Sequence, residues 1–202
     1  MTRWLRPLTP LFALVFVAAL SAQDANKAKL ETKGTDDYYP LAQGTTWTYK
    51  IGEKKATAKV IAHEKQGALT VAKIETTIDD KPVAEEQVAH SPEGIVRLSY
   101  GGEKSKTPVL IWKAGAKKGE SWDVKTEISG TAVEGKFTAG EEKIKVPAGE
   151  FECVTATGEF TIQGDTAKFV YWFAKDKGVV KLLMTFKGQD ILLELEKFEP
   201  GK

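Results

Sequence analysis

The sequence predicts an all-β fold, a strongly curved antiparallel meander of about nine to eleven strands that forms an open or closed barrel. Three observations carry this prediction. Apolar side chains alternate with polar ones along most runs beyond residue 45. Turn residues separate those runs at short intervals, and outside the first 22 residues no dozen-residue window has the 3.6-residue apolar period of a helix. With 202 residues, the chain is long enough for one domain with a substantial core.

The first 22 residues have the pattern of a secretory signal peptide. Arg3 and Arg6 give a positive start, residues 11–20 form an unbroken apolar run, and small residues follow at Ser21 and Ala22. The apolar run is about half the ~20 residues that a membrane-spanning helix needs, which disfavours a retained anchor. We therefore expect cleavage near Ser21 or Ala22 and an exported protein, periplasmic or extracellular, without an integral membrane span.

Residues 23–37 carry almost no large apolar side chains, so we expect a flexible leader between the cleavage site and the folded part. The charges are nearly balanced, with 29 Lys and Arg against 28 Asp and Glu. Loss of Arg3 and Arg6 with the signal would leave 27 basic residues against 28 acidic ones. A nucleic-acid partner is not expected, because neutralising phosphates requires a clear basic excess.

Residues 38–202 are expected to form a single antiparallel β domain. Its strands show one apolar and one polar face, which is typical of sheets with one buried side. The alternating apolar sets are Trp47, Tyr49 and Ile51; Val96, Leu98 and Tyr100; Trp122, Val124 and Ile128; and Val180, Leu182, Met184 and Phe186. Residues 82–88 fit either a short helical turn or a strand.

The run AKFVYWFA at residues 167–174 is apolar on both faces. Phe169, Tyr171 and Phe173 lie on one side, and Val170 and Trp172 lie on the other. A strand of this kind is buried on both faces. We therefore expect it to lie centrally, with a loop, the leader or a partner over its outer face.

Three segments resemble the recurring motifs of a known group of proteins. They read YYPLAQGTTWTY at residues 38–49, VPAGEFECV at 146–154 and YWFAKDKGVVK at 171–181. In this order they are similar to motifs of a diffuse group of exported bacterial β-rich proteins of unknown function. The resemblance implies a bent antiparallel sheet like the open barrels of periplasmic lipoprotein carriers, or a lipocalin-like one. The resemblance implies no catalytic residues. This sequence departs from the group at residues 175–177, where Lys-Asp-Lys replaces the Pro-Gly type of turn that the group usually has.

Residues with catalytic or metal-binding chemistry are few and scattered. His63 and His90 are the only histidines, they lie in different runs, and we expect both to be exposed strand-end residues. Cys153 is the only cysteine, and it shares the parity of Phe151, which predicts a buried, inert thiol. The sequence therefore predicts no catalytic residue, no metal site and no cofactor.

The leading functional hypothesis is a non-catalytic envelope protein that binds an apolar small molecule or lipid in the concave face of its sheet. The candidate lining residues are Trp47, Tyr49, Trp122, Phe169, Tyr171 and Leu182. One alternative is a structural or interaction protein that binds another protein through a sheet edge, with Glu194, Glu196 and Lys197 as edge-protecting charges. Another is an enzyme in which His63 or His90 meets carboxylates in a cleft. The protein partner and the oligomeric state are left open.

Overall fold

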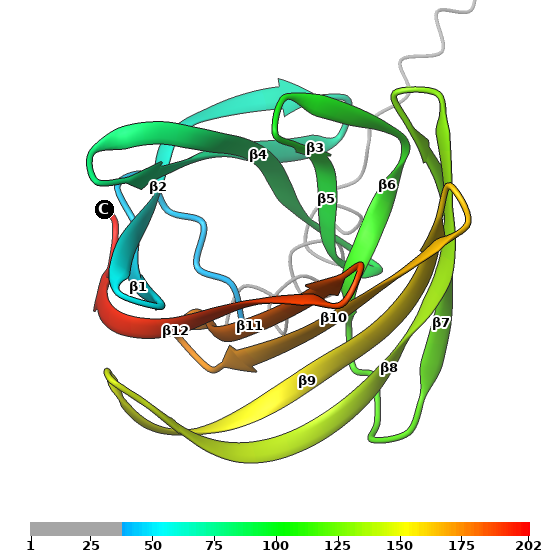
Figure 1. Ribbon diagram of the computed structural model, residues 1–202. Helices are drawn as coiled ribbons and strands as arrows, with labels where there is room; N and C mark the ends of the chain where they lie inside the picture. The colour runs from blue at the N-terminus through cyan, green and yellow to red at the C-terminus, as the bar shows by residue number, and fades with distance from the viewer. Residues whose placement is uncertain (1–37) are drawn as a thin grey trace, which may run out of the picture.

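Residues 38–202, which the computed structural model describes, form a closed barrel of antiparallel strands (Figure 1). Each strand pairs with its neighbours in the chain, and β1 closes the ring by pairing with β12. The predicted signal peptide (1–22) and leader (23–37) lie outside the described residues. The strands are β1 (Thr46–Ile51), β2 (Lys54–Gln66), β3 (Leu69–Ile78), β4 (Lys81–Ser91), β5 (Gly94–Tyr100), β6 (Glu103–Lys113), β7 (Ser121–Ile128), β8 (Thr131–Val146), β9 (Gly149–Ile162), β10 (Asp165–Ala174), β11 (Gly178–Phe186) and β12 (Gln189–Glu199).

The all-β antiparallel prediction is confirmed, but the described chain has twelve strands rather than nine to eleven. Residues 82–88 belong to β4 and not to a helical turn, because pairing with β3 and β5 satisfies their backbone hydrogen bonds. None of residues 38–202 lies in a helix that could cross a bilayer. The strand β12 is no sheet edge at Glu194 and Lys197, since β1 pairs with both residues, so these charges do not protect a free edge.

The two ends of the barrel differ. Six two-residue turns, from 52–53 to 187–188, lie at one end, which we call the hairpin end. The other end, which we call the terminal end, carries the start of β1 and the end of β12. It also carries the turns that lead from each even-numbered strand to the next odd-numbered strand. Turn residues such as Asp79 and Asp80 adopt positive φ angles of 50° and 60°, as the mirror-image turns of tight hairpins require.

The terminal end is closed by residues 38–45, which we call the plug segment; Figure 1 shows it running inside the ring of strands. Tyr39 is 5% exposed, and its ring packs against Trp47 and Phe173. Two histidines hold the plug by its backbone: His90 Nε2 donates to the carbonyl of Tyr39 at 2.9 Å, and His63 Nε2 donates to that of Leu41 at 2.7 Å.

An aromatic network fills the interior behind the plug. Ring centroids of successive pairs lie between 4.9 and 6.5 Å apart, the range of favourable edge-to-face and offset contacts. A glycine makes room for it, because a Cβ at Gly158 would lie 2.5 Å from the rings of Phe137 and Phe160. The network comprises Tyr38, Tyr39, Trp47, Trp112, Trp122, Phe137, Phe160, Phe169, Tyr171, Phe173 and Phe198.

The strand β10 is covered on both faces, as its apolar pattern predicts. On its outer face Trp172 is only 8% exposed, and its Nε1 donates to Glu142 Oε2 at 2.7 Å. The cover is the end of the β8–β9 hairpin, which runs beneath β10–β12 in Figure 1. A hydrogen bond of 2.8 Å from Ala148 N to the carbonyl of Leu195 ties the hairpin turn to β12. The sheet thus folds back so that two parts of its outer face pack together.

The seam between β6 and β7 has the sparsest backbone pairing of the barrel, a single pair at Ser105 and Ile128. Side chains complete the closure. Thr126 Oγ1 accepts from Thr107 N at 3.1 Å and donates to Thr107 O at 2.9 Å. Trp122 Nε1 donates to the carbonyl of Leu110 at 2.8 Å. The ring of strands is therefore closed here mainly by side-chain hydrogen bonds.

Candidate functional site

The exposed large apolar side chains of residues 38–202 gather at the hairpin end of the barrel. There are five of them, each within five residues of a two-residue turn at that end. Soluble proteins expose scattered apolar residues, but a concentration at one end of a barrel is typical of a binding surface. These residues are Val83, Tyr100, Phe186, Ile191 and Leu192, with exposures of 54%, 51%, 43%, 48% and 37%.

Three of the five face the lumen. Directly opposed residues of paired strands point to the same side of a sheet. Tyr100 opposes Glu86, Phe186 opposes Ala167, and Ile191 opposes Met184. Below them lies a tier of half-buried inward-facing residues. It comprises Ile51, Ile78, Phe169, Leu182, Met184 and Leu193. We call the inward-facing apolar surface that these two tiers form the mouth.

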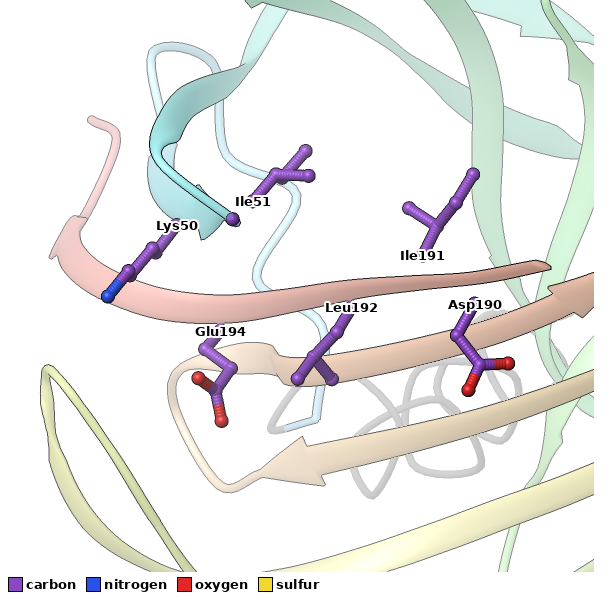
Figure 2. Close-up of a pocket in the computed structure, with 7 residues that line it drawn as sticks. Lys50, Ile51, Asp190, Ile191, Leu192 and Glu194 are labelled. Carbon is purple, nitrogen blue, oxygen red and sulfur yellow. The ribbon is translucent and has the colours of Figure 1, made fainter.

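The wall of the mouth has a notch beside β12. The ladder between β1 and β12 ends at the pair Lys50–Glu194, so residues 189–193 pair with β11 but have no partner in β1. An open hollow of about 530 Å³ lies there. Figure 2 shows Ile51 and Ile191 pointing to the inner side of β12, while Leu192 and Glu194 point to its outer side. The notch therefore gives lateral access to the apolar lining.

A buried ion pair lies between the mouth and the plugged core. Arg97 Nε donates to Glu86 Oε2 at 2.8 Å, and the two side chains are 19% and 11% exposed. Arg97 Nη1 also donates to the hydroxyl of Tyr171 at 3.0 Å. Burying two charges is expensive unless they are paired and hydrogen-bonded, and both conditions hold here.

Each partner of the pair also contacts a different tyrosine. The ring of Tyr100, at the mouth, lies 5.4 Å from the guanidinium carbon of Arg97. The hydroxyl of Tyr39, in the plug, lies 3.5 Å from Glu86 Oε1, within hydrogen-bonding range. The positive partner therefore contacts the tyrosine at the mouth, and the negative partner contacts the tyrosine of the plug.

The pKa shifts of these two tyrosines agree with the contacts. Burial raises the pKa of Tyr100, and of the two charges Arg97, which lowers that pKa, acts more strongly than Glu86. Burial also raises the pKa of Tyr39, but there Glu86 raises it more strongly than Arg97 lowers it. Arg97 thus acts more strongly on Tyr100, and Glu86 acts more strongly on Tyr39.

Four of the six residues predicted to line a ligand site lie in the packed core. Trp47, Tyr49, Trp122 and Tyr171 are between 0% and 8% exposed. The polar atoms of three of them already form hydrogen bonds to backbone carbonyls of the barrel. Trp47 Nε1 donates to Lys177 O at 2.6 Å, and Tyr49 OH donates to Val179 O at 2.8 Å. The third is the bond from Trp122 to Leu110 described above. The remaining two, Phe169 and Leu182, are half-buried and face the mouth.

The structure thus brings all six residues to one lumen, but at two depths. Only Phe169 and Leu182 belong to the lining of the mouth. Phe169 stands at the junction, since its ring packs on those of Phe160 and Tyr171. Ligand contact by any of the six remains a prediction.

The sequence did not predict that Arg97, Glu86 and Tyr100 form a group. Simple alternation predicts Val96, Leu98 and Tyr100 on one face and Arg97 on the other. Register shifts of β5 against β4 and β6 disrupt that alternation, so Arg97 and Tyr100 both reach the lumen. Val96 packs instead with Val71 and Ala89 in a separate cluster. An arginine inside the otherwise apolar run GIVRL was the available signal.

Residues weighed for chemistry have structural partners. His63 is exposed as expected, whereas His90 is half-buried, and both bind plug carbonyls as described above. Burial, and secondarily the nearby Glu142 carboxylate, raises the pKa of Cys153 to about 12, as a buried unreactive thiol requires. No group of three or more His, Cys, Asp or Glu placed to hold a metal ion occurs among residues 38–202.

Comparison with known proteins shows likeness at the level of the fold. No family model matches the chain, and no curated protein matches it by sequence. Among solved structures, a "putative exported protein with YmcC-like fold" from Bacteroides fragilis is similar with a TM-score of 0.53 at 13% identity. A "putative lipoprotein" from Parabacteroides distasonis is similar with a TM-score of 0.50 at 16% identity. Each alignment covers 80% of this chain and 98% of the other.

Proposed function

We propose that this protein is an exported, non-catalytic binding protein that takes up an apolar or amphipathic small molecule through the mouth at the hairpin end of its barrel. The observation that carries the proposal is the one-sided distribution of exposed apolar side chains. Tyr100, Phe186 and Ile191 face the lumen at this end, whereas Tyr39 and its neighbours fill the other end.

The energetics support an occupant. Covering apolar surface contributes roughly 25 cal/mol per Å², so leaving several large inward-facing side chains in water is unfavourable. A ligand that lies against Ile191, Phe186 and the half-buried tier below would remove this exposure. The closed terminal end would give such a ligand a single route in, and the notch beside β12 would widen that route.

Export is supported by the arginines and apolar run of residues 1–22. The solved proteins of similar fold carry the descriptions "putative lipoprotein" and "putative exported protein", which agree with this placement. A non-catalytic role is supported by the engagement of His63 and His90 with plug carbonyls.

Co-purification gives the direct test. Native mass spectrometry of the protein from its own host is expected to show an added mass that organic extraction removes. The same protein, once extracted, should bind the neutral fluorescent probe N-phenyl-1-naphthylamine saturably. An extracted protein that fails to bind the probe, together with a native spectrum of the bare polypeptide, would contradict the proposal.

Neighbouring residues on β12 provide a matched pair of variants. Ile191→Glu places a carboxylate in the mouth, and Leu192→Glu places one on the outer face at similar exposure. Ile191→Glu should weaken probe binding by about tenfold or more, because a charge would face the apolar ligand. Leu192→Glu should leave it within about twofold. Equal loss in both variants would place binding outside the lumen.

A further inference from the structure

The ion pair at the floor of the mouth is unusual in its position. Replacing a buried ion pair by apolar groups of similar volume is often neutral or stabilising, so a pair inside a small barrel is not explained by stability alone. Arg97 and Glu86 are surrounded by aromatic residues that would pack well against aliphatic side chains. Their polarity is therefore a candidate for ligand recognition.

The guanidinium of Arg97 has more donors than the hydrogen bonds of the described residues engage. A guanidinium has five N–H groups. The hydrogen bonds found among residues 38–202 engage Nε with Glu86 and Nη1 with Tyr171. Tyr100, which is 51% exposed at the open end, offers Arg97 the face of its ring rather than an acceptor. An incoming ligand oxygen would meet the remaining donors beneath this ring.

The surroundings of these donors match an amphiphile. Phe169 and Leu182 lie on strands β10 and β11 beside Tyr171, and Met184, Phe186 and Ile191 continue the apolar lining to the rim. A chain lying along this wall would bring its polar end to the floor. Arg97 is the partner whose guanidinium contacts the ring of Tyr100 at the rim, so a negative head group that enters past Tyr100 would meet a positive charge.

We propose that Arg97 is the head-group anchor for an anionic single-chain amphiphile, a carboxylate or phosphate on an acyl chain that lies along the β10–β12 wall of the mouth. This inference rests on the proposed function, which requires only that an apolar or amphipathic molecule enters. Guanidinium pairs with carboxylates and phosphates through parallel N–H···O bonds, which gives the anchor its specificity.

The test compares three ligands that share one oleoyl chain: oleate, oleoyl glycerol phosphate and the uncharged monoolein. Each is titrated below its aggregation concentration by displacement of N-phenyl-1-naphthylamine. At least one anionic ligand should bind about tenfold or more tightly than monoolein, since a charge-assisted hydrogen bond is gained. The tighter of the two anionic ligands distinguishes a carboxylate head group from a phosphate one.

Variants separate the anchor from the apolar wall. The neutral double variant Glu86→Gln/Arg97→Met leaves no unpaired charge, so it should fold and bind all three ligands with affinities within about twofold of one another. The matched control Glu159→Gln/Lys168→Met removes an exposed pair, at 3.1 Å on the outer face, and should keep the wild-type selectivity. Circular dichroism and a melting curve check the fold of each variant.

The outcomes distinguish the two proposals. If the wild-type protein binds none of the three ligands and no probe, the proposed function fails and the anchor fails with it. If it binds the three equally, or if the double variant keeps the preference for anions, only the anchor is wrong. If the double variant does not fold, the wild-type protein still tests the anchor. A preference for an anionic ligand supports the anchor, and equal binding of the three ligands overturns it.

Discussion

The backbone amide of Gly201 donates a hydrogen bond to the side-chain oxygen of Thr45 at 3.0 Å, which joins the end of the chain to the plug segment. Thr45 is fully buried, and the amide of Lys202 donates to Gln43 O at 3.1 Å beside it. The approach leaves no room at position 201, where a Cβ would lie 2.4 Å from Gln43 O. The terminal end of the barrel is thus sealed by both ends of the described chain.

Thr45→Val tests this seal. The isosteric valine keeps the packing but removes the acceptor, so the amide of Gly201 loses its partner. The free energy of unfolding should fall by about 1–2 kcal/mol, measured by urea denaturation. Thr185→Val, which removes an exposed hydroxyl bonded to Asp190, is the control and should change stability by less than about 0.5 kcal/mol. An equal effect of both substitutions would contradict a buried seal.

The Arg97–Glu86 pair should be far more sensitive to single than to double neutralisation. Arg97→Met alone leaves the Glu86 carboxylate buried without its partner and should destabilise the protein by about 3–5 kcal/mol. Glu86→Gln/Arg97→Met removes both charges and should recover most of that loss. Thermal and urea denaturation of both variants check this. A double variant as unstable as Arg97→Met, or less stable, would contradict the predicted interaction of the two charges.

Closure of the β6–β7 seam should depend on Thr126. Its hydroxyl stands in for a ladder hydrogen bond by both accepting from and donating to the backbone of Thr107. Thr126→Val should speed amide hydrogen exchange in β6 and β7 by about tenfold or more while leaving β9 and β10 unchanged. Uniformly faster exchange across all strands would indicate global destabilisation instead.

Cys153 should be unreactive in the native protein. With its pKa near 12 rather than the usual 9.0, the thiol stays protonated at pH 8 and reacts slowly with iodoacetamide. In urea the reaction should accelerate sharply.

The same shift of the Cys153 pKa makes stability depend on pH, and the sign follows from linkage. Above pH 9 the unfolded chain loses the thiol proton while the folded chain keeps it up to about pH 12. The contribution of this group to the free energy of unfolding should therefore decline between those values. Cys153→Ala should reduce that decline, and an identical pH profile for wild type and variant would contradict the shift.

Local alternation in the sequence determined most of the strand faces. The parity of Trp47 and Tyr49, of Trp122 and Val124, and of Leu182 and Met184 predicted which side chains share the inner face. The double-sided pattern of residues 167–174 also predicted that β10 is covered on both sides. These inferences succeed because successive side chains of a strand point to opposite faces, so burial leaves a period of two in the sequence.

Only the tertiary structure decided the site. A register shift turns Arg97 and Tyr100 toward the same lumen, and such shifts depend on both neighbouring strands rather than on β5 alone. Closure of the barrel, the folding back of the β8–β9 hairpin and the insertion of Tyr39 likewise join residues far apart in the chain. The period of two in the sequence shows which strand faces are apolar. The contacts that fill one end of the lumen and leave the other open join residues far apart in the chain, so no local pattern predicts them.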